Sequence, residues 1–460
     1  MNILLVKPPS IGDHIQPPLG LGYLASSVKE KHNVRILDML KQGISVRSFK
    51  AYLAGSHFDV IGFQLYTIDL KAVKQLLSVV REVLPEAITV IGGPHPTVCP
   101  DETLNLYEGL ADYLFIGEAE ASFPQFLEQV NGGSAFSNVP GLCWRNNGQI
   151  VKNPPAALLS DLDKLPILSW DLIKPEEYPP AQHGAFYKNF PIAPIITTRG
   201  CPYRCSFCSA PVLSGGKIRK RAVSSVMEEI FLLYKTHGIR EIHIVDDNFS
   251  CDKNHAKSIL QAIIDSGMKI SLAFPNGLRI ETLDDELVGL MKKCGVYLIS
   301  LGIESGSDRI LGLMNKSLKV GTTVMKVELI RNSGIDMAGF FVLGFPGETE
   351  KDIEETIELS IRLPLIRANY FDFLPLPGTA IYKELLQKGE LSHIDWEHFF
   401  FMSAPYSPAG ITRERLRQLQ KKAFWRFYMR PKIIIKNISQ IQSPRHFWYL
   451  LKRFYRWVLS

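Results

Sequence analysis

Short apolar runs alternate with amphipathic stretches over the first part of the chain. The apolar runs are rich in branched residues and have the length of strands that are buried on both faces of a sheet; they are residues 2–6, 33–38, 58–64, 87–92 and 112–116. Between them, stretches such as 69–83 and 119–130 show the helical period of about 3.6 residues. This alternation predicts a doubly wound, Rossmann-like α/β domain over residues 1–135.

The pattern changes after this domain. Residues 139–153 form two polar-apolar runs around Asn147-Gly148, a dipeptide typical of a two-residue hairpin turn. A proline-rich stretch follows from Pro154 to Pro194 and suits a connecting segment better than a regular element. The sequence therefore predicts a hairpin and a linker over residues 136–193.

A second alternation begins at residue 194. The expected strands are 194–198, 241–246, 270–275, 296–302, 336–343 and 368–374, and the expected helices are 222–237, 253–266, 283–294, 320–332 and 349–362. Six βα units are too few for a closed eight-stranded barrel, so we expect a partial (β/α)6 barrel over residues 194–400. The spacing from residue 401 to residue 460 predicts a helical C-terminal region.

Composition adds limits on the class of protein. The shares of apolar (46%) and charged (21%) residues are ordinary for a globular protein. The first apolar run is short and ends at Lys7 before two prolines, which favours a strand over a signal peptide, and no run approaches the roughly 20 apolar residues of a membrane span. Seven cysteines, three of them within eight residues, do not resemble a disulfide framework. We expect a cytoplasmic protein.

The strongest chemical signal is the segment Thr198-Arg-Gly-Cys-Pro-Tyr-Arg-Cys-Ser-Phe-Cys208, directly after the first strand of the second domain. Thiolates are the usual ligands of iron–sulfur clusters, and a tight loop can wrap three of them around one cubane while the fourth iron stays open to a chelating substrate. A zinc site would need a fourth nearby Cys or His, and Cys251 lies far along the chain. Inert buried thiols fit poorly in a loop flanked by Arg, Pro and Ser. We therefore predict a [4Fe–4S] cluster on Cys201, Cys205 and Cys208.

With these residues, the region 194–400 resembles the radical S-adenosylmethionine (SAM) superfamily. The resemblance implies that SAM chelates the open iron and that Phe207 lies near its adenine. Other matches fall at the ends of the expected strands, where such barrels place their active sites; they are Asp246 and Asp247, then Glu304 and Ser305, then Gly344 and Gly347. In many relatives a Gly-Gly-Glu-like segment stands where this chain has Asp246-Asp247-Asn248, so that match is looser. Asn276 to Arg279, at the third strand end, are expected to line the substrate cavity.

The first domain resembles the cobalamin-binding domain of one large class of these enzymes. The residues that the resemblance places at the cobalamin are Pro9, Gly20, Gly22, Gln64, Thr67, Gly92, Gly93, Pro94 and Glu118. The motif Asp-x-His-x-x-Gly, whose histidine ligates cobalt, is absent, and radical SAM members commonly lack it. We therefore expect cobalt without a protein imidazole, and a hydrogen-bonding role for His95.

The two resemblances together imply a cobalamin-dependent radical SAM enzyme, and most of all a methyltransferase that modifies an unactivated carbon of a small-molecule or lipid-like substrate. In this family, reductive cleavage of SAM gives a 5′-deoxyadenosyl radical, and an external donor of the flavodoxin or ferredoxin type supplies the electron. The same cofactors could serve cyclisation, ring contraction or oxidation. A more distant alternative is a non-catalytic module that uses the three cysteines structurally.

The basic charge of the chain is concentrated at its end. Residues 411–460 carry 13 Lys and Arg against Glu414 alone, together with many aromatic residues, although the net charge of the whole chain is only +6. Such a stretch can cover the barrel with its aromatic face or make a peripheral contact with an anionic membrane. We expect the covering role, and we expect no nucleic-acid partner because nothing else in the chain is basic.

Overall fold

The computed structural model describes residues 1–10, 15–133, 135–180, 186–391, 396, 399–400, 403–444 and 446–451. The chain divides into two compact units, the first comprising Met1–Tyr178 with Val212–Gly215 and the second comprising Pro179–Pro211 with Gly216–Ser460. Each unit has its own sheet, and each is described by itself.

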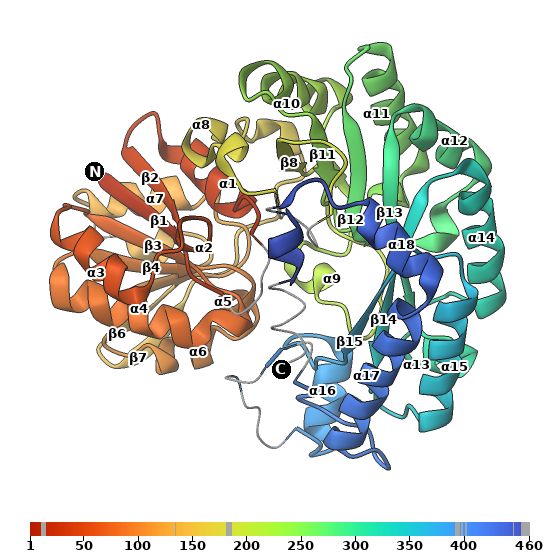
Figure 1. The fold of residues 1–460 in the computed structure, drawn as a ribbon. Coiled ribbons are helices and arrows are strands. Elements are labelled where there is room, and N and C mark those ends of the chain that lie inside the picture. Colours follow the sequence, from red (N-terminus) through yellow and green to blue (C-terminus); the bar gives the residue numbers. More distant parts are fainter. Residues whose placement is uncertain are drawn as a thin grey trace. The chain divides into compact units, whose positions relative to one another are not determined.

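The first unit is built on a seven-stranded sheet with the order β2-β1-β3-β4-β5-β6-β7. The strands are β1 (Asn2–Lys7), β2 (Asn33–Asp38), β3 (Val60–Gln64), β4 (Ile88–Gly92), β5 (Tyr113–Phe115), β6 (Leu142–Asn146) and β7 (Gln149–Lys152). The first five are parallel and are joined through helices that include α1 (Leu19–Val28), α3 (Val46–Ala54) and α4 (Leu70–Val83), while α7 (Phe123–Val130) connects β5 to β6 (Figure 1). The predicted doubly wound α/β domain is confirmed.

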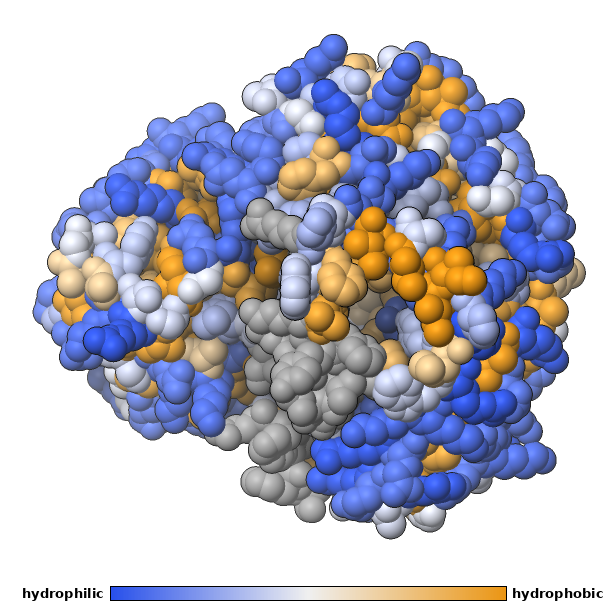
Figure 2. Space-filling model, in the orientation of Figure 1, coloured by the Kyte–Doolittle hydropathy of each residue, from blue (hydrophilic) through white to orange (hydrophobic). Residues whose placement is uncertain are grey.

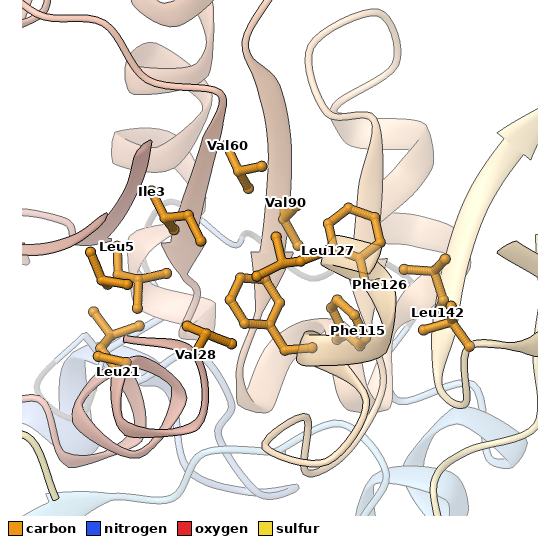
Figure 3. Close-up of a cluster of buried hydrophobic side chains, with 14 residues drawn as sticks. Ile3, Leu5, Leu21, Val28, Val60, Val90, Phe115, Phe126, Leu127 and Leu142 are labelled. Carbon is orange, nitrogen blue, oxygen red and sulfur yellow. The ribbon is translucent and has the colours of Figure 1, made fainter. Parts of the chain in front are cut away.

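The apolar runs are continuous because helices cover both faces of the parallel strands. Alternate residues of β1, such as Ile3 and Leu5, enter the cluster of buried side chains shown in Figure 3, where α1 and α7 pack against the sheet. Leu4 and Val6 point to the other face and are also fully buried. The strand therefore has no polar side.

The hairpin β6-β7 belongs to this sheet. Asn147 and Gly148 both have positive φ (49° and 80°), as a two-residue hairpin turn requires, and β6 pairs antiparallel with β5. The first unit consequently extends past residue 135, the end expected from the sequence. The reason is that β6 occupies the open edge of β5 and contributes Leu142 to the core.

The second unit holds a six-stranded, all-parallel sheet with the order β15-β14-β13-β12-β11-β8. Its strands are β8 (Ile192–Ile195), β11 (Glu241–Ile244), β12 (Ser271–Leu278), β13 (Val296–Glu304), β14 (Asp336–Leu343) and β15 (Arg367–Asp372). The helices α10 (Val223–Thr236), α11 (Lys253–Asp265), α12 (Asp285–Lys293), α14 (Val320–Ser333) and α15 (Glu350–Arg362) lie along its outer side (Figure 1). The predicted partial barrel is confirmed, and each predicted strand and helix falls on an observed one.

The helix α17 (Arg413–Tyr428), the first described helix after residue 401, lies along the edge strand β15. Gln420 donates through Nε2 to the Tyr370 carbonyl oxygen at 2.9 Å, and the Tyr428 hydroxyl bonds the Ala368 carbonyl oxygen at 3.0 Å. An unpaired strand edge offers free backbone groups to other chains. Side chains of α17 satisfy part of that edge here, so the predicted covering role is confirmed for this helix.

Charge pairing holds the same helix against α15. Arg415, Lys422 and Arg426 pair with three of the acidic residues of α15, namely Glu350, Glu354 and Glu358. Exposed pairs of this kind contribute about 0–1 kcal/mol each. Burial of the apolar face, which contains Leu416, Leu419, Ala423 and Phe427, therefore dominates the attachment.

The next helix, α18 (Pro431–Ser439), leaves apolar side chains at the surface. Ile435 and Ile438 are 68% and 62% exposed, and Figure 2 shows an apolar area over this helix. None of the described helices has both the length and the apolar composition needed to cross a bilayer. A peripheral membrane contact through residues 411–460 stays a prediction.

The burial of α17 predicts different costs for two neighbouring aromatic residues. Phe427→Ala should lower the free energy of unfolding by about 3–5 kcal/mol, because this side chain is fully buried. Trp425→Ala is the control and should cost under about 1 kcal/mol, because the tryptophan is 41% exposed. Chemical unfolding of the full chain measures both. Equal, small losses would mean that α17 does not cover the sheet in solution.

Candidate functional site

The three motif cysteines lie on a loop, residues 200–208, that has no helix or strand of its own. The loop follows the short strand β9 (Thr198–Arg199) and begins at Gly200. The φ of Gly200 is +94°, which glycine adopts readily but which strains other residues. The Gly200 amide donates to Asp247 Oδ2 at 3.0 Å. Asp247 stands just beyond the end of β11, so the second strand end supports the start of the loop.

Residues that follow other strand ends hold the rest of the loop. The Ser206 amide donates to the Met314 carbonyl oxygen at 2.9 Å, and Asn315 Nδ2 donates to the Arg204 carbonyl oxygen at 2.7 Å. Met314 and Asn315 lie on the segment after β13. The Ser206 carbonyl oxygen accepts from the Ile381 amide at 3.1 Å, which adds the segment after β15.

Two further contacts come from the ends of β12 and β14. Arg279, directly after β12, places Nη1 at 3.6 Å from Cys205 Sγ. Phe207 meets Phe345, just after β14, edge to face with a centroid distance of 6.4 Å. Because the strands are parallel, their carboxyl ends meet at one edge of the sheet, and the segments that follow five of these strands contact this single loop.

The three thiols are partly exposed and free of disulfides. Burial raises the pKa of Cys201, and it raises that of Cys208 to about 12, because a thiolate is poorly solvated there. Iron bound by these sulfurs would offset this cost by supplying positive charge. Three soft sulfur donors on a glycine-initiated loop fit an iron–sulfur cluster. Among the described residues, no three His, Cys, Asp or Glu side chains meet closely enough to ligate a single metal ion.

Asp246 and Asp247 accept hydrogen bonds from backbone amides and hydroxyls of the protein. Asp246 is 3% exposed and accepts from the Thr197 amide at 2.6 Å and from the hydroxyls of Thr197 and Thr198 at 2.5 and 2.8 Å. Burial raises its pKa to about 6, against the opposing effect of these hydrogen bonds. Both carboxylates thus brace the segment that leads from β8 into the cysteine loop.

Glu304 ends β13 in a conformation that is rare for a residue with a side chain. Its φ is +65°, and its Oε1 lies 2.5 Å from Lys316 Nζ, which also donates to the Gly302 carbonyl oxygen at 2.6 Å. Both side chains of the pair are largely buried. Such strain persists only where surrounding contacts hold it. Ser305 points inward instead, with its hydroxyl 3.2 Å from that of Thr356.

The glycines after β14 shape a tight turn. Gly344 and Gly347 have φ of +80° and +79°, and a Cβ on Gly344 would lie 2.5 Å from Leu416 of α17. Glu348 Oε2 accepts from the amides of Gly344 and Phe345. Its Oε1 is buried without a partner among the described residues, and burial raises the pKa of Glu348 to about 8.

In the first unit, the strand order 2-1-3-4-5 places the topological switch point between β1 and β3, where doubly wound folds bind ligands. Gln64 is the last residue of β3 and Thr67 follows it, and Gly93 follows β4 with φ +123°. A Cβ on Gly93 would lie 2.8 Å from the Leu65 carbonyl oxygen, so only glycine fits. Thr67 Oγ1 lies 3.0 Å from His95 Nδ1.

His95 is 3% exposed, and burial lowers its pKa to about 4, so the ring is neutral near pH 7. Its bond to Thr67 agrees with the hydrogen-bonding role expected from the sequence. Asp69, which sequence reasoning missed, is also buried near this edge, and its pKa is raised to about 6 by burial.

The remaining predicted residues of this unit are spread more widely. Pro9 follows β1, Pro94 begins the helix α5 (Pro94–Val98), and Gly117-Glu118 follow β5. Gly20 is exposed. A Cβ added to Gly20 or to Gly92 would have no atom within 4 Å, so neither position requires glycine for packing. Gly22 is different, because a Cβ there would lie 2.7 Å from Leu168 and Ile173. Its small size is required by packing within the unit.

Sequence reasoning missed Lys316 and did not connect Arg279 with the cysteines. Lys316 comes directly after Met314-Asn315, whose contacts with the loop are made across more than a hundred residues. No local pattern in the sequence indicates these contacts, because a single lysine or arginine at the end of an amphipathic segment is usually solvated.

Comparison with known families gives two matches. Residues 195–360 match the model of the radical SAM superfamily, and residues 13–127 match that of the B12 binding domain. A solved structure of the radical SAM methyltransferase TsrM from Kitasatospora setae has a TM-score of 0.71 and 20% identity, and the alignment covers 84% of this chain and 76% of that one. This likeness concerns the fold.

Three relatives are similar over most of their length. An uncharacterized methyltransferase of Pyrococcus horikoshii is 30% identical over 100% of this chain and 98% of its own. Cytidylyl-2-hydroxyethylphosphonate methyltransferase of Streptomyces wedmorensis is 28% identical over 81% and 78%. Anaerobic magnesium-protoporphyrin IX monomethyl ester cyclase of Rubrivivax gelatinosus is 24% identical over 90% and 74%.

The buried carboxyl of Glu348 predicts a pH-dependent stability. An acid whose pKa is raised by folding stabilises the fold fully below its unfolded value of 4.5, and this contribution is lost as the pH rises through about 8. Between these two pKa values, the free energy of unfolding falls by up to about 1.4 kcal/mol per pH unit. Glu348→Gln keeps a neutral acceptor for the two amides and should remove the dependence.

Unfolding midpoints measured between pH 6 and pH 9 test this. The wild type should lose stability relative to Glu348→Gln as the pH rises. Glu350→Gln is the control, because this exposed carboxylate pairs with Arg415 and its pKa is lowered, so it should show the wild-type slope. Parallel curves for wild type and Glu348→Gln would show that the buried carboxyl does not titrate in this range.

Proposed function

The chain belongs to the cobalamin-binding radical SAM enzymes, and on this premise we propose that it is a methyltransferase that acts on an unactivated carbon of a small-molecule or lipid-like substrate. Two family matches and a relative 30% identical over its whole length establish the membership. Its cofactors are a [4Fe–4S] cluster, SAM and cobalamin.

The observation that carries the proposal is the cysteine loop, which segments that follow five strands of the radical SAM barrel contact at one edge of the sheet. When bound, the cluster and SAM supply a radical that removes a substrate hydrogen atom, and cobalamin supplies the methyl group. The chain's own residues bind these groups, orient them and exclude water. Similarity to two methyltransferases over most of the chain supports methyl transfer as the outcome.

In this proposal Cys201, Cys205 and Cys208 ligate the cluster, and Phe207 packs beside SAM. Glu304 accepts from the ribose hydroxyls of SAM, and its ion pair with Lys316 fixes the carboxylate in place. A preorganised carboxylate lowers the entropy that binding must overcome.

The other predicted SAM contacts divide by their surroundings. Gly344 and Gly347 bring backbone close to the ligand in a turn whose positive φ angles favour glycine at both positions. Asp246, Asp247 and Ser305 act by holding the cysteine loop and the strand ends in shape, because their polar atoms form hydrogen bonds with protein groups.

For cobalamin we propose the carboxyl edge of the first unit, near the switch point between β1 and β3. Gly92, Gly93 and Pro94 let the backbone approach a large flat ligand, and Pro9, Gln64, Thr67 and Glu118 flank them. Gly20 remains in the proposal, while Gly22 is required by packing alone. His95 is held by Thr67 and does not ligate cobalt.

Radical cyclisation is the second candidate, because the cyclase of Rubrivivax gelatinosus is similar over 90% of this chain. The mass of the product separates the two functions, since methylation adds one methylene and cyclisation does not. An external one-electron donor of the flavodoxin or ferredoxin type would reduce the cluster. The free cysteines support a reducing, cytoplasmic location.

Replacement of all three loop cysteines by alanine should abolish the visible absorbance of the cluster and the cleavage of SAM, because the variant lacks the three thiolates that we propose as ligands. Iron analysis and assay of methionine release measure the effect. Cys251→Ala is the control and should keep full iron and full cleavage. A triple variant that still holds its iron would refute the ligand assignment.

Cobalamin binding predicts a spectroscopic signature. Electron paramagnetic resonance of the cob(II)alamin form should show no splitting by an axial nitrogen, because His95 is buried and bonded to Thr67. His95→Gln should leave the spectrum unchanged, since glutamine can keep a hydrogen bond to the threonine. Nitrogen splitting that disappears in His95→Gln would instead identify this histidine as the ligand.

A further inference from the structure

Arg279 is the one buried cation that the described structure places against a cluster cysteine. It follows the carboxyl end of β12, is 9% exposed, and brings Nη1 to 3.6 Å from Cys205 Sγ. Sulfur is larger than oxygen, so this separation suits an N–H···S hydrogen bond. We propose that Arg279 donates to the Cys205 sulfur and raises the reduction potential of the cluster; this inference rests on the proposed ligation by the three cysteines.

Two neighbours fix the guanidinium in this position. Its central carbon lies 3.8 Å from the ring centroid of Tyr203, a residue of the cysteine loop itself, and its Nη2 lies 2.7 Å from Glu281 Oε1. Stacking on an aromatic face and a carboxylate at one edge use the planar shape of arginine, which lysine does not share. Nη1 is thereby directed at sulfur.

The charges around Arg279 indicate whether the arginine meets Cys205 as a thiol or as a thiolate. A buried charge is costly unless it is paired. Glu281 supplies one carboxylate, and Glu281 Oε2 and Arg279 Nε are both buried without partners among the described residues. A neutral thiol is a weak acceptor, whereas a thiolate that ligates iron takes a charge-assisted hydrogen bond. The guanidinium is therefore placed to serve the ligated cysteine.

The effect on the cluster follows from electrostatics. Reduction adds one electron from the external donor to the oxidised [4Fe–4S] cluster, no bond is broken, and the cluster becomes more negative by one charge. A fixed positive charge with a hydrogen bond to a ligand sulfur stabilises the more negative state. Arg279 thus makes reduction of the cluster easier. The negative charge of Glu281, which pairs with the guanidinium, partly offsets this effect of Arg279.

The proposal predicts shifts of opposite sign for two neighbouring residues. In the reconstituted full-length protein, a redox titration followed by electron paramagnetic resonance should give a more negative cluster potential for Arg279→Gln. Arg279→Lys should fall between this variant and the wild type, because the charge remains but the fork and the stacking are lost. Glu281→Gln should shift the potential to more positive values, since it removes the opposing charge.

Arg240→Gln is the matched control. Arg240 also stacks on a tyrosine, Tyr234, at 4.3 Å, but it precedes β11, at the other end of the sheet from the cysteine loop. Its replacement should leave the potential unchanged. This control shows whether loss of any stacked arginine disturbs the cluster through general destabilisation.

The outcomes separate the inference from the proposed function. Wild-type protein that takes up no iron, or a triple-cysteine variant that keeps it, would refute the function. A full cluster with an unchanged potential in Arg279→Gln would overturn the inference alone. If Arg279→Gln holds no cluster, the sign of the shift in Glu281→Gln decides, because a positive shift supports the proposal and no shift overturns it.

Discussion

The cysteine loop has no secondary structure, so its shape depends on hydrogen bonds that other parts of the chain donate to it and accept from it. Each cysteine that ligates a cluster must point at one shared centre, which a free loop of this composition would not maintain. The bonds from Asp247, Met314, Asn315 and Ile381 supply this constraint. They come from segments that are far apart in the sequence, and only the parallel sheet brings them together.

The same sheet edge concentrates charge in places that water hardly reaches. Lys316 with Glu304, and Arg279 with Glu281, are ion pairs at the ends of adjacent strands, and all four side chains are largely buried. Pairs of this kind contribute little to net stability, because desolvation of both charges cancels most of their attraction. Their effect is positional, since a paired side chain keeps one orientation.

An open sheet also has an edge whose backbone groups are unpaired. In the second unit, helix α17 covers the edge at β15. The helix α17 covers β15 with an apolar face, bonds two of its carbonyl oxygens and extends Leu416 to Gly344 beside the site. A segment that is distinguished in the sequence by its charge thus works mainly through its buried side chains. Three of its basic residues are used in ion pairs with α15.

Periodicity in the sequence determined both sheets, because burial of each strand on two faces leaves a local record in its residues. The spacing of Cys201, Cys205 and Cys208 likewise indicated the type of cofactor, because three thiols within eight residues are typical of an iron–sulfur cluster. Tertiary structure alone decided that the hairpin extends the first sheet and that Asp246 braces Thr197. It also decided that Gly22 serves packing and that Lys316 and Arg279 face the site. These facts depend on contacts across tens to hundreds of residues. The residues next to a side chain in the sequence do not indicate which distant atom it will contact.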